Sequence, residues 1–404
     1  MSVFAQLVAR LNDALATAEV KAFTAGLSLR VRIDVDDQSH DLFINASPAQ
    51  PDIAGDIAIW ASADDWALVL ADPPPPTYHS FSSIQLRNPR FKITGDALRI
   101  AQARACFEAI FANLTAHDTT TPLPDLQRLR GSYHRVTTAT GQVAQLFSET
   151  AGTGTPVLCL HTAGADTRQF HGIMCDDELS KNWRFVGFDM PYHGRSMPPT
   201  GWDGSIYSLD QATYLDWCVS FIEQVIGEPV VVMGCSMGAG IAMVLAAERP
   251  DLIKAVIALE APLRPRGRRN AYLTHAQVNG GWHSAAYVRG LLGPQSPADL
   301  RRRAAFIYSQ GAPGIYDGDL AFYSDEFDGE EVARRIDGRS IPVSLLIGHY
   351  DFSATVNDAH QLAGWIEGAE VIEMPELGHF PMTEHPAAML RYLRPIFAKL
   401  HATS

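Results

Sequence analysis

The 404-residue sequence has few of the features that mark secreted, membrane-spanning or nucleic-acid-binding proteins. Its five cysteines are scattered, and their spacing indicates neither a disulfide framework nor a zinc site. No apolar run of about 18 residues is present, so no membrane span is expected. A net charge of −13 argues against nucleic-acid partners. The first residues lack the basic start of a signal peptide, and we expect a cytoplasmic protein.

Residues 1–115 have helical and strand-like apolar patterns of their own, which predict a small α+β domain. The order of these patterns, with Gly95-Asp96 before the last helix, resembles the sterol-carrier-protein-2-like domains, whose members bind lipids in an apolar tunnel. The resemblance implies an apolar ligand, and the alternative is a packing or dimerisation module without a ligand. The expected helices cover residues 3–18, 62–70 and 96–111, and the expected strands cover residues 27–35, 41–45, 56–60, 84–86 and 91–94.

The sequence Gly-Cys-Ser-Met-Gly at residues 234–238 directly follows an apolar run at residues 229–233. A helical apolar pattern comes next, so the pentapeptide is predicted to form the turn between a buried strand and a helix. Such a turn strains its central serine and presents the hydroxyl at the edge of a sheet. Small residues are needed on both sides because strand and helix approach closely there. Ser236 is therefore the candidate nucleophile.

Two further candidates follow Ser236, each after a strand-like run. Asp351 comes after residues 342–348, and His379 comes after residues 369–374. Because the carboxyl ends of parallel strands share one edge of a sheet, we expect the three side chains to meet there. A serine hydroxyl needs an imidazole to take its proton, and the imidazole needs an ionised carboxylate to orient it. Glu260, which ends another strand-like run, is an alternative acid.

The chain order Ser, Asp, His is that of the α/β-hydrolases. Together with the residues after the strand-like run 155–160 and with the segment 185–196, it resembles the esterase, C–C hydrolase and haloperoxidase-like group of that superfamily. The resemblance covers residues 131–402. It implies an α/β-hydrolase fold, in which a mostly parallel sheet has helices on both faces and a helical cap.

An oxyanion hole needs two backbone N–H groups aimed at the developing charge. One is expected from Met237, the residue after the nucleophile. The resemblance implies Ala163 for the other. Thr162 stands where the family usually has glycine, which makes it the alternative donor. His161 resembles the structural histidine of the family, so we do not assign it a catalytic role.

About 80 residues separate Glu260 from the next strand-like run, more than one connection requires. The resemblance therefore implies a hydrolase core at residues 131–260 and 341–404 and a helical cap at residues 261–340, after a polar linker at residues 116–130. One cap arginine is a candidate for binding a substrate carboxylate. The candidates are Arg264, Arg266, Arg268, Arg269, Arg289, Arg301, Arg302 and Arg303. The pocket candidates are His161, Trp282, Tyr287, Tyr308, Phe322 and Tyr323.

These observations predict a serine hydrolase that cleaves a small to medium ester through an acyl-enzyme, with no metal and no organic cofactor. The substrate is expected to be apolar or aromatic, and a carboxylate-bearing monoester is a variant. A C–C bond hydrolase of ring-fission products uses the same three residues, and an amidase, thioesterase or lactonase remains open. The alternative outside the enzymes is a lipid-binding protein that keeps the hydrolase fold.

Overall fold

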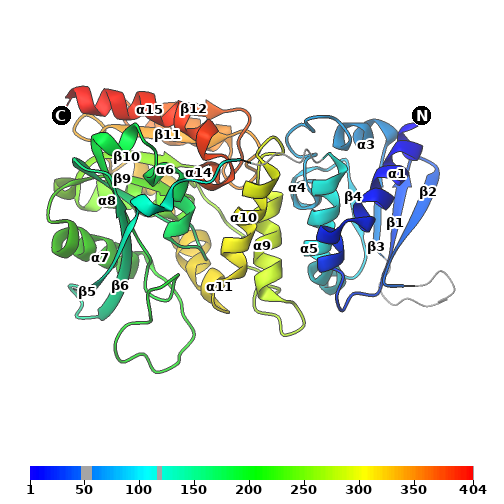
Figure 1. Cartoon of the computed structure of the whole chain (residues 1–404), viewed down its shortest axis with the longest axis horizontal. Helices are drawn as coiled ribbons and strands as arrows, with labels where there is room; N and C mark the ends of the chain where they lie inside the picture. The colour runs from blue at the N-terminus through cyan, green and yellow to red at the C-terminus, as the bar shows by residue number, and fades with distance from the viewer. Residues whose placement is uncertain (47–56, 116–120, 404) are drawn as a thin grey trace.

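The computed structural model describes residues 1–46, 57–115 and 121–403, and these residues form two β-sheets (Figure 1). A four-stranded sheet lies in the N-terminal part, and an eight-stranded, mostly parallel sheet lies in the rest. The expected fold class is thereby confirmed. Of the expected linker, residues 116–120 lie outside the described residues, as does Asp56 of the expected third strand.

The N-terminal sheet has the strand order β2-β1-β3-β4. β1 alternates in burial, so that Leu29, Val31 and Ile33 enter a core that also contains Trp66 and Phe107. This is the pattern of a strand with one buried face. The strands are β1 (Leu29–Val35), β2 (Gln38–Ile44), β3 (Ile57–Ala61) and β4 (Lys92–Thr94), and the helices are α1 (Val3–Ala16), α2 (Ala18–Ala22), α3 (Ala63–Val69), α4 (Phe81–Arg87) and α5 (Ala97–Leu114).

The prediction of a strand at residues 84–86 is wrong, because these residues lie within α4. Ser80 begins this helix with a capping box, in which the Ser80 and Ser83 side chains accept from each other's backbone N–H groups across 3.1 Å. Three residues are too few to show a period, and the cap decides for the helix. The resemblance of this region to sterol-carrier-protein-2-like domains stays a prediction.

The larger sheet has the strand order β12-β11-β10-β9-β7-β8-β6-β5. β6 pairs antiparallel with both of its neighbours, and the pairs from β8 to β12 are parallel. All residues of β9 and β11 are buried, as expected for strands covered on both faces. The strands are β5 (Arg130–Thr137), β6 (Val143–Ala151), β7 (Thr155–Leu160), β8 (Trp183–Phe188), β9 (Val230–Cys235), β10 (Ile253–Leu259), β11 (Val343–Gly348) and β12 (Glu370–Met374).

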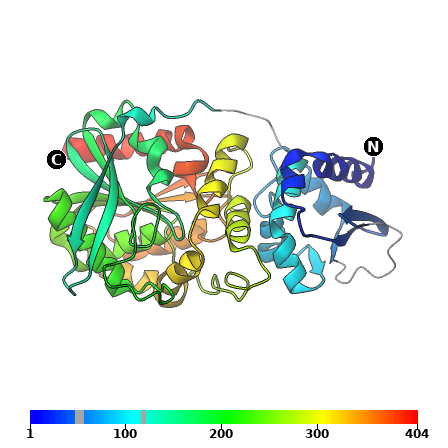
Figure 2. The ribbon, with the colours of Figure 1, turned by 60° about the horizontal axis from the view of Figure 1, so that its bottom comes forward.

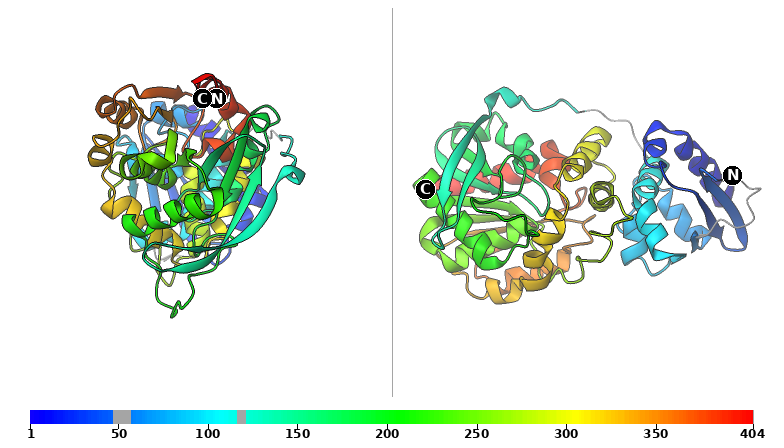
Figure 3. Two further views of the ribbon diagram at one scale, coloured as in Figure 1. Left: turned by 90° about the vertical axis from the view of Figure 1, so that its left-hand side faces the viewer. Right: turned by 90° about the horizontal axis from the view of Figure 1, so that it is seen from below.

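Helices cover both faces of this sheet, as the end view in Figure 3 shows. Consecutive residues of one strand enter two different hydrophobic cores. Leu158 packs in the same core as Trp217, and Val157 packs in the same core as Phe397. The α-helices of the two layers are α6 (His171–Met174), α7 (Gln211–Phe221), α8 (Met237–Glu248), α13 (Val356–Trp365), α14 (Pro381–Glu384) and α15 (Pro386–Thr403). None of the described helices combines the length and apolar character needed to cross a bilayer.

A helical insertion, residues 261–342, connects β10 to β11. Its first helix packs against α5 of the N-terminal part, so that the insertion lies between the two sheets (Figures 1 and 2). Gly290 at the end of that helix accepts hydrogen bonds from His79 and Ser80. The helical segments are α9 (Gly280–Gly290), α10 (Ala298–Ser309), α11 (Ile315–Leu320), the π-helix η6 (Ala321–Glu326) and α12 (Gly329–Ala333).

Candidate active site

Ser236 lies at the turn where β9 ends and α8 begins. Its φ of 54° is in the left-handed region, which strains a residue with a side chain. A Cβ at Gly234 would lie 2.1 Å from the carbonyl oxygen of Gly238, and a Cβ at Gly238 would lie 2.2 Å from that of Leu160. The close approach of strand and helix therefore requires both glycines around the serine.

His379 connects Ser236 to Asp351 by two hydrogen bonds. Ser236 Oγ donates to His379 Nε2 across 2.8 Å, and His379 Nδ1 donates to Asp351 Oδ2 across 2.5 Å. Asp351 follows β11 and His379 follows β12, so both reach the serine from the carboxyl edge of the sheet. Both side chains are almost fully buried, and exclusion of water strengthens their hydrogen bond. The structure thus brings together the three residues that the sequence singles out.

The alternative acid, Glu260, is also buried in this cluster at the end of β10. Burial and the neighbouring Asp351 raise the pKa of Glu260 well above the usual value, which favours its neutral form. Its two oxygens accept from the N–H of Gly348 at 2.9 and 3.1 Å, and a hydrogen bond joins it to Asp351. Asp351 therefore serves as the direct partner of His379, and Glu260 supports Asp351.

Within the described ranges, Glu260, Asp351 and His379 form the one group of potential metal ligands whose atoms lie within 4.8 Å of one another. A metal with bonds of roughly 2 Å would hold two ligand atoms about 3 Å apart or more. His379 Nδ1 and Asp351 Oδ2 are 2.5 Å apart, a separation that indicates a hydrogen bond. We therefore interpret the cluster as a hydrogen-bonded system and assign no metal or cofactor to it.

Glu384 on α14 holds the loop that carries His379. One of its carboxylate oxygens accepts from the N–H groups of Gly378 and Phe380, both at 3.1 Å, and the other accepts from the N–H of Gly293 at 2.5 Å. Burial raises the pKa of Glu384 to about 7. These contacts fix the residues on both sides of His379 and connect them to the helical insertion.

The N–H groups of Met237 and Ala163 form no hydrogen bond with the described part of the chain. Met237 is the first residue of α8, where an N–H has no acceptor within the helix. The alternative donor, Thr162, is excluded because its N–H already donates to Gln169 Oε1 across 3.0 Å. Met237 and Ala163 thus retain the two donors that an oxyanion hole requires.

We name residues 161–165 the oxyanion loop. Side chains from other parts of the chain hold the first half of this loop in place. Gln169 Oε1 also accepts from the Thr162 hydroxyl at 3.1 Å, and the Tyr308 hydroxyl contacts both Thr162 and Gln169. His161 is buried, and burial lowers its pKa to about 4. Its neutral Nε2 accepts from the N–H of Met190 at 3.2 Å, so His161 supports the backbone and is not a pocket residue.

The second half of the oxyanion loop is held by Asp319 of α11. Asp319 Oδ2 accepts from the N–H of Gly164 at 2.7 Å and from His193 Nε2 at 2.8 Å, and Oδ1 accepts from the Tyr207 hydroxyl at 2.7 Å. Burial lowers the pKa of His193, but Asp319 more than offsets this effect, so the pKa is raised overall. This fully buried pair connects the helical insertion to the loop beside Ser236.

Besides His161, two further residues that the sequence predicts in the pocket, Trp282 and Phe322, pack elsewhere. Trp282 lies edge-on against Phe23 of the N-terminal part, with ring centroids 5.6 Å apart. Phe322 is fully buried between the rings of Tyr214 and Phe327. Their aromatic character therefore reflects packing, at a contact between the two parts of the chain and in the larger core.

Tyr323 of η6 is close to the reaction centre. Its hydroxyl lies beside Ser236 and Ser353, and burial raises its pKa to about 12. Within the described chain, neither this hydroxyl nor that of Ser353 has a hydrogen-bond partner of regular geometry, although both are buried. Two unpaired hydroxyl groups therefore face the space beside the candidate nucleophile.

A cavity of about 250 Å³ has Arg268, a neighbour of Tyr323, in its wall. Its walls include the predicted pocket residue Tyr287 and Phe352, which directly follows Asp351. We name this cavity the arginine pocket, and the lining residues that define it are Arg87, Arg266, Arg268, Tyr287, Tyr316 and Phe352.

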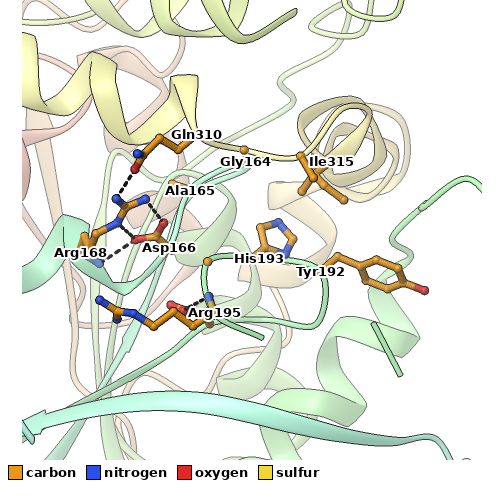
Figure 4. Close-up of a pocket in the computed structure, with 13 residues that line it drawn as sticks. Gly164, Ala165, Asp166, Arg168, Tyr192, His193, Arg195, Gln310 and Ile315 are labelled. Carbon is orange, nitrogen blue, oxygen red and sulfur yellow. Dashed lines mark hydrogen bonds and ion pairs between the residues drawn. The ribbon is translucent and has the colours of Figure 1, made fainter. Parts of the chain in front are cut away.

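A second cavity, of about 320 Å³, has Gly164 and Ala165 of the oxyanion loop among its lining residues (Figure 4). Its charged groups are paired with protein atoms: Arg168 binds Asp166 and Gln310, and Arg195 binds Glu149 at 3.2 Å. Because these groups already satisfy one another, we assign no chemistry to this cavity.

Gln169, Asp319 and Glu384 support the site, although no sequence pattern predicts this role. None of them lies in a motif of the kind that identifies Ser236, and each acts on a loop from a different element. Only the folded arrangement shows which loop each one contacts. The signal that could have found them is their chemical type, since acids and amides that become buried require partners.

The model of the alpha/beta hydrolase fold family matches residues 155–386. A pimeloyl-[acyl-carrier protein] methyl ester esterase from Chromobacterium violaceum is 27% identical over 61% of this chain and 96% of its own length. An (E)-2-((N-methylformamido)methylene)succinate hydrolase from Acinetobacter baylyi is 27% identical over 31% of this chain and 46% of its own length.

Solved structures show the same fold. A thermophilic esterase from Thermogutta terrifontis has a TM-score of 0.58 at 20% identity, covering 67% of this chain and 99% of the other. The enol-lactonase from Burkholderia xenovorans has a TM-score of 0.56 at 18% identity, covering 66% of this chain and all of the other. Because the family match spans more than half of the 404 residues, the chain belongs to the alpha/beta hydrolase fold family.

Proposed function

We propose that this hydrolase is a serine enzyme that cleaves carboxylic esters through an acyl-enzyme intermediate. The observation that carries the proposal is the uninterrupted hydrogen-bonded series from Ser236 through His379 to Asp351. The left-handed conformation of Ser236 and the unpaired N–H groups of Met237 and Ala163 support it. These are the groups that acyl transfer to a serine requires.

In this mechanism, His379 Nε2 removes the proton from Ser236 Oγ as the oxygen attacks the ester carbonyl. Asp351 holds the imidazole in the tautomer that leaves Nε2 free and stabilises the imidazolium. The N–H groups of Met237 and Ala163 donate to the oxyanion as it forms. The imidazolium then protonates the leaving alkoxide. A water that His379 deprotonates attacks the acyl-enzyme, releases the acid and restores Ser236.

The names of two relatives support a substrate that is an ester or that carries a carboxylate group. The Chromobacterium violaceum relative is named for a methyl ester, and the Acinetobacter baylyi relative is named for a succinate derivative. The aromatic walls of the arginine pocket, Tyr287, Tyr316 and Phe352, suit a small to medium apolar or aromatic group. We infer a substrate of that size, which carries either a neutral or an acidic second group.

We further propose that residues 131–260 and 341–404 form the hydrolase core and that residues 261–340 act as its cap. Two contacts support this division: Tyr323 of the insertion lies beside Ser236, and the carbonyl of Leu291 accepts from the N–H of His379 at 2.9 Å. Residues 1–115 are then a separate N-terminal domain joined by residues 116–130. A cap placed in this way shapes the substrate space above the serine.

The test is the reaction of wild-type protein and the Ser236→Ala variant with a fluorophosphonate probe and with 4-nitrophenyl butyrate. Loss of the nucleophile is expected to abolish labelling and to lower kcat by about 10⁴- to 10⁶-fold. The matched control is Ser353→Ala, which removes a neighbouring hydroxyl and is expected to keep the label. Labelling that persists in Ser236→Ala would contradict the proposal.

A parallel panel distinguishes the remaining reactions that the same three residues catalyse. The panel contains an amide, a thioester, a lactone and a vinylogous diketone from aromatic ring fission, each matched in size to the ester. Ester hydrolysis is expected to be fastest. A higher kcat/KM for the diketone would assign C–C bond cleavage instead, and absence of both labelling and turnover would favour a binding protein that keeps the fold.

A further inference from the structure

The arginine pocket is a locally positive cavity in a chain whose net charge is −13. Arg87, Arg266 and Arg268 are three of its lining residues, and none of the described residues that line it is acidic. A cleft with one sign of charge and low-dielectric walls concentrates ligands of the opposite sign. The pocket is therefore suited to an anion, although the molecule as a whole repels anions.

Two of the residues that line the pocket, Tyr316 and Arg268, connect it to the candidate site. The ring of Tyr316 covers Gly164 of the oxyanion loop so closely that a Cβ there would lie 2.8 Å from it. The guanidinium of Arg268 is close enough to Asp351 for the charge of this carboxylate to act on it. Because Tyr323 lies near both Arg268 and Ser236, an anionic group bound at Arg268 is expected to lie near an ester carbonyl placed at Ser236.

Arg268 lies in the wall of this pocket, on a loop that is anchored to Ser324 of η6. Its N–H donates to the Ser324 hydroxyl at 3.0 Å, and the guanidinium of Arg266 donates to the carbonyl of Ser324 at 3.1 Å. The neighbouring Arg269 is paired with Asp317 at 2.9 Å. A loop anchored at these points loses little conformational entropy when a ligand binds, which favours affinity.

Arg268 differs from the nearby arginines in the side chains that contact its guanidinium. It forms no ion pair with a carboxylate in the described part of the chain, whereas Arg264 and Arg269 each bind two. Tyr316 contacts its guanidinium by a hydrogen bond, and Tyr323 lies nearby. The Tyr323 hydroxyl, on a side chain that is 2% exposed, is itself unpaired. A cation and a hydroxyl donor thus remain available to the same ligand.

We propose that Arg268 binds a free carboxylate of the substrate, so that the enzyme acts on short esters that carry an acid group, such as monoesters of dicarboxylic acids. The inference rests on the proposed serine hydrolase function and names its substrate class. The planar guanidinium donates two parallel N–H···O bonds to the carboxylate, a geometry that lysine cannot supply. The ester carbonyl of the same molecule then lies at Ser236, within reach of the oxyanion loop.

The test compares monomethyl glutarate with dimethyl glutarate, which differ in one charged group. Wild-type protein is expected to have a kcat/KM about 10- to 150-fold higher for the acid, the ratio that one charge-assisted contact supports. Arg268→Gln is expected to remove most of this preference, and Arg268→Lys is expected to keep only part of it. The matched control is Arg269→Gln in the same loop, which is expected to keep the preference of the wild type.

Binding measured without turnover separates this inference from the proposed function. In the Ser236→Ala background, calorimetric titration with monomethyl glutarate is expected to show about 10- to 150-fold weaker binding when Arg268 is also replaced by Gln. Equal binding by the two proteins, or equal rates on the two esters, would overturn the role of Arg268. Arg268-dependent binding without Ser236-dependent hydrolysis would overturn only the proposed function.

Discussion

The carboxyl groups of Glu260 and Asp351 lie in contact beneath the candidate nucleophile, and only one of them faces the imidazole of His379 as a hydrogen-bond acceptor. Two buried carboxylates cannot both be ionised at so short a distance without a large energetic cost. Burial and Asp351 raise the pKa of Glu260, which favours the neutral form of Glu260. The pair therefore consists of a neutral supporting acid, Glu260, and the hydrogen-bond acceptor of His379, Asp351.

Replacing either acid by its amide separates these two roles. Glu260→Gln is expected to keep kcat/KM within about tenfold, because a neutral amide can donate to Asp351 and accept from the N–H of Gly348. Asp351→Asn is expected to lower kcat by about 10³- to 10⁴-fold, because the imidazole loses its charged partner. Steady-state kinetics with 4-nitrophenyl butyrate measure both changes. A larger loss for Glu260→Gln would reverse the assignment of the acid.

The oxyanion loop is expected to depend on Gln169. Gln169→Leu leaves the buried N–H of Thr162 unpaired, so the loop shifts and Ala163 no longer points at the oxyanion. We expect kcat to fall by about 10- to 100-fold, approaching the loss of one oxyanion donor, while KM changes little. Tyr308→Phe, which removes a hydroxyl in contact with Thr162 and Gln169 but keeps the bond from Thr162 N–H to Gln169, is expected to cause a smaller loss. An equal loss in both variants, or a change confined to KM, would contradict this role.

Local sequence patterns predict the three residues of the candidate triad because each directly follows an apolar run, and a parallel sheet brings the ends of such runs together. Arg268 shows what such patterns leave undetermined. The sequence offers eight arginines between residues 264 and 303 as carboxylate ligands. Which of them is unpaired depends on acids far away in the chain, such as Asp317 for Arg269 and Glu19 for Arg289.

The same limit applies to the fold. The alternation of residues 29–35 predicts β1, because one face of that strand is buried against a core made of the same region. Trp282 has an aromatic side chain on an expected helix, but periodicity does not reveal that Phe23 covers it. The polar linker pattern suggests that the N-terminal region is independent of the rest. The contact between α5 and α9 depends on tertiary packing that no local pattern encodes.

The buried pair of His193 and Asp319 is expected to make stability depend on pH. Because the pKa of His193 is raised in the folded state, its contribution to the free energy of unfolding is fully present below its unfolded pKa of about 6.5. This contribution is lost as the pH rises through the folded value. Chemical unfolding from pH 5.5 to 9 measures it as the difference between wild type and Asp319→Asn, which should shrink as the pH rises. A difference that is constant with pH would contradict the assignment.

The N-terminal region contacts the loop that carries Asp351. The Tyr350 hydroxyl donates to the carbonyl of Pro74 at 3.0 Å, and the His79 ring lies edge-on against that of Tyr350, with centroids 5.1 Å apart. Arg87 of α4 lines the arginine pocket. Glu19 pairs with Arg289 of α9 at 2.8 Å, with both side chains largely buried. Described residues of the N-terminal region thus form part of the surroundings of the candidate site.

Removal of residues 1–115 is therefore expected to lower stability and, in any protein that stays folded, to reduce kcat/KM by at least about tenfold. Tyr350→Phe tests the same contact in the full-length chain: loss of one buried hydrogen bond corresponds to about 0.5–1.5 kcal/mol and is expected to lower the unfolding temperature. Tyr133→Phe, a substitution on β5 at the opposite edge of the large sheet from β12, is the matched control for kcat/KM. Calorimetry of the wild type should show one cooperative transition, because the two parts share buried polar contacts. Two separate transitions, together with a truncated protein of full activity, would show that the N-terminal region folds alone and leaves the candidate site unchanged.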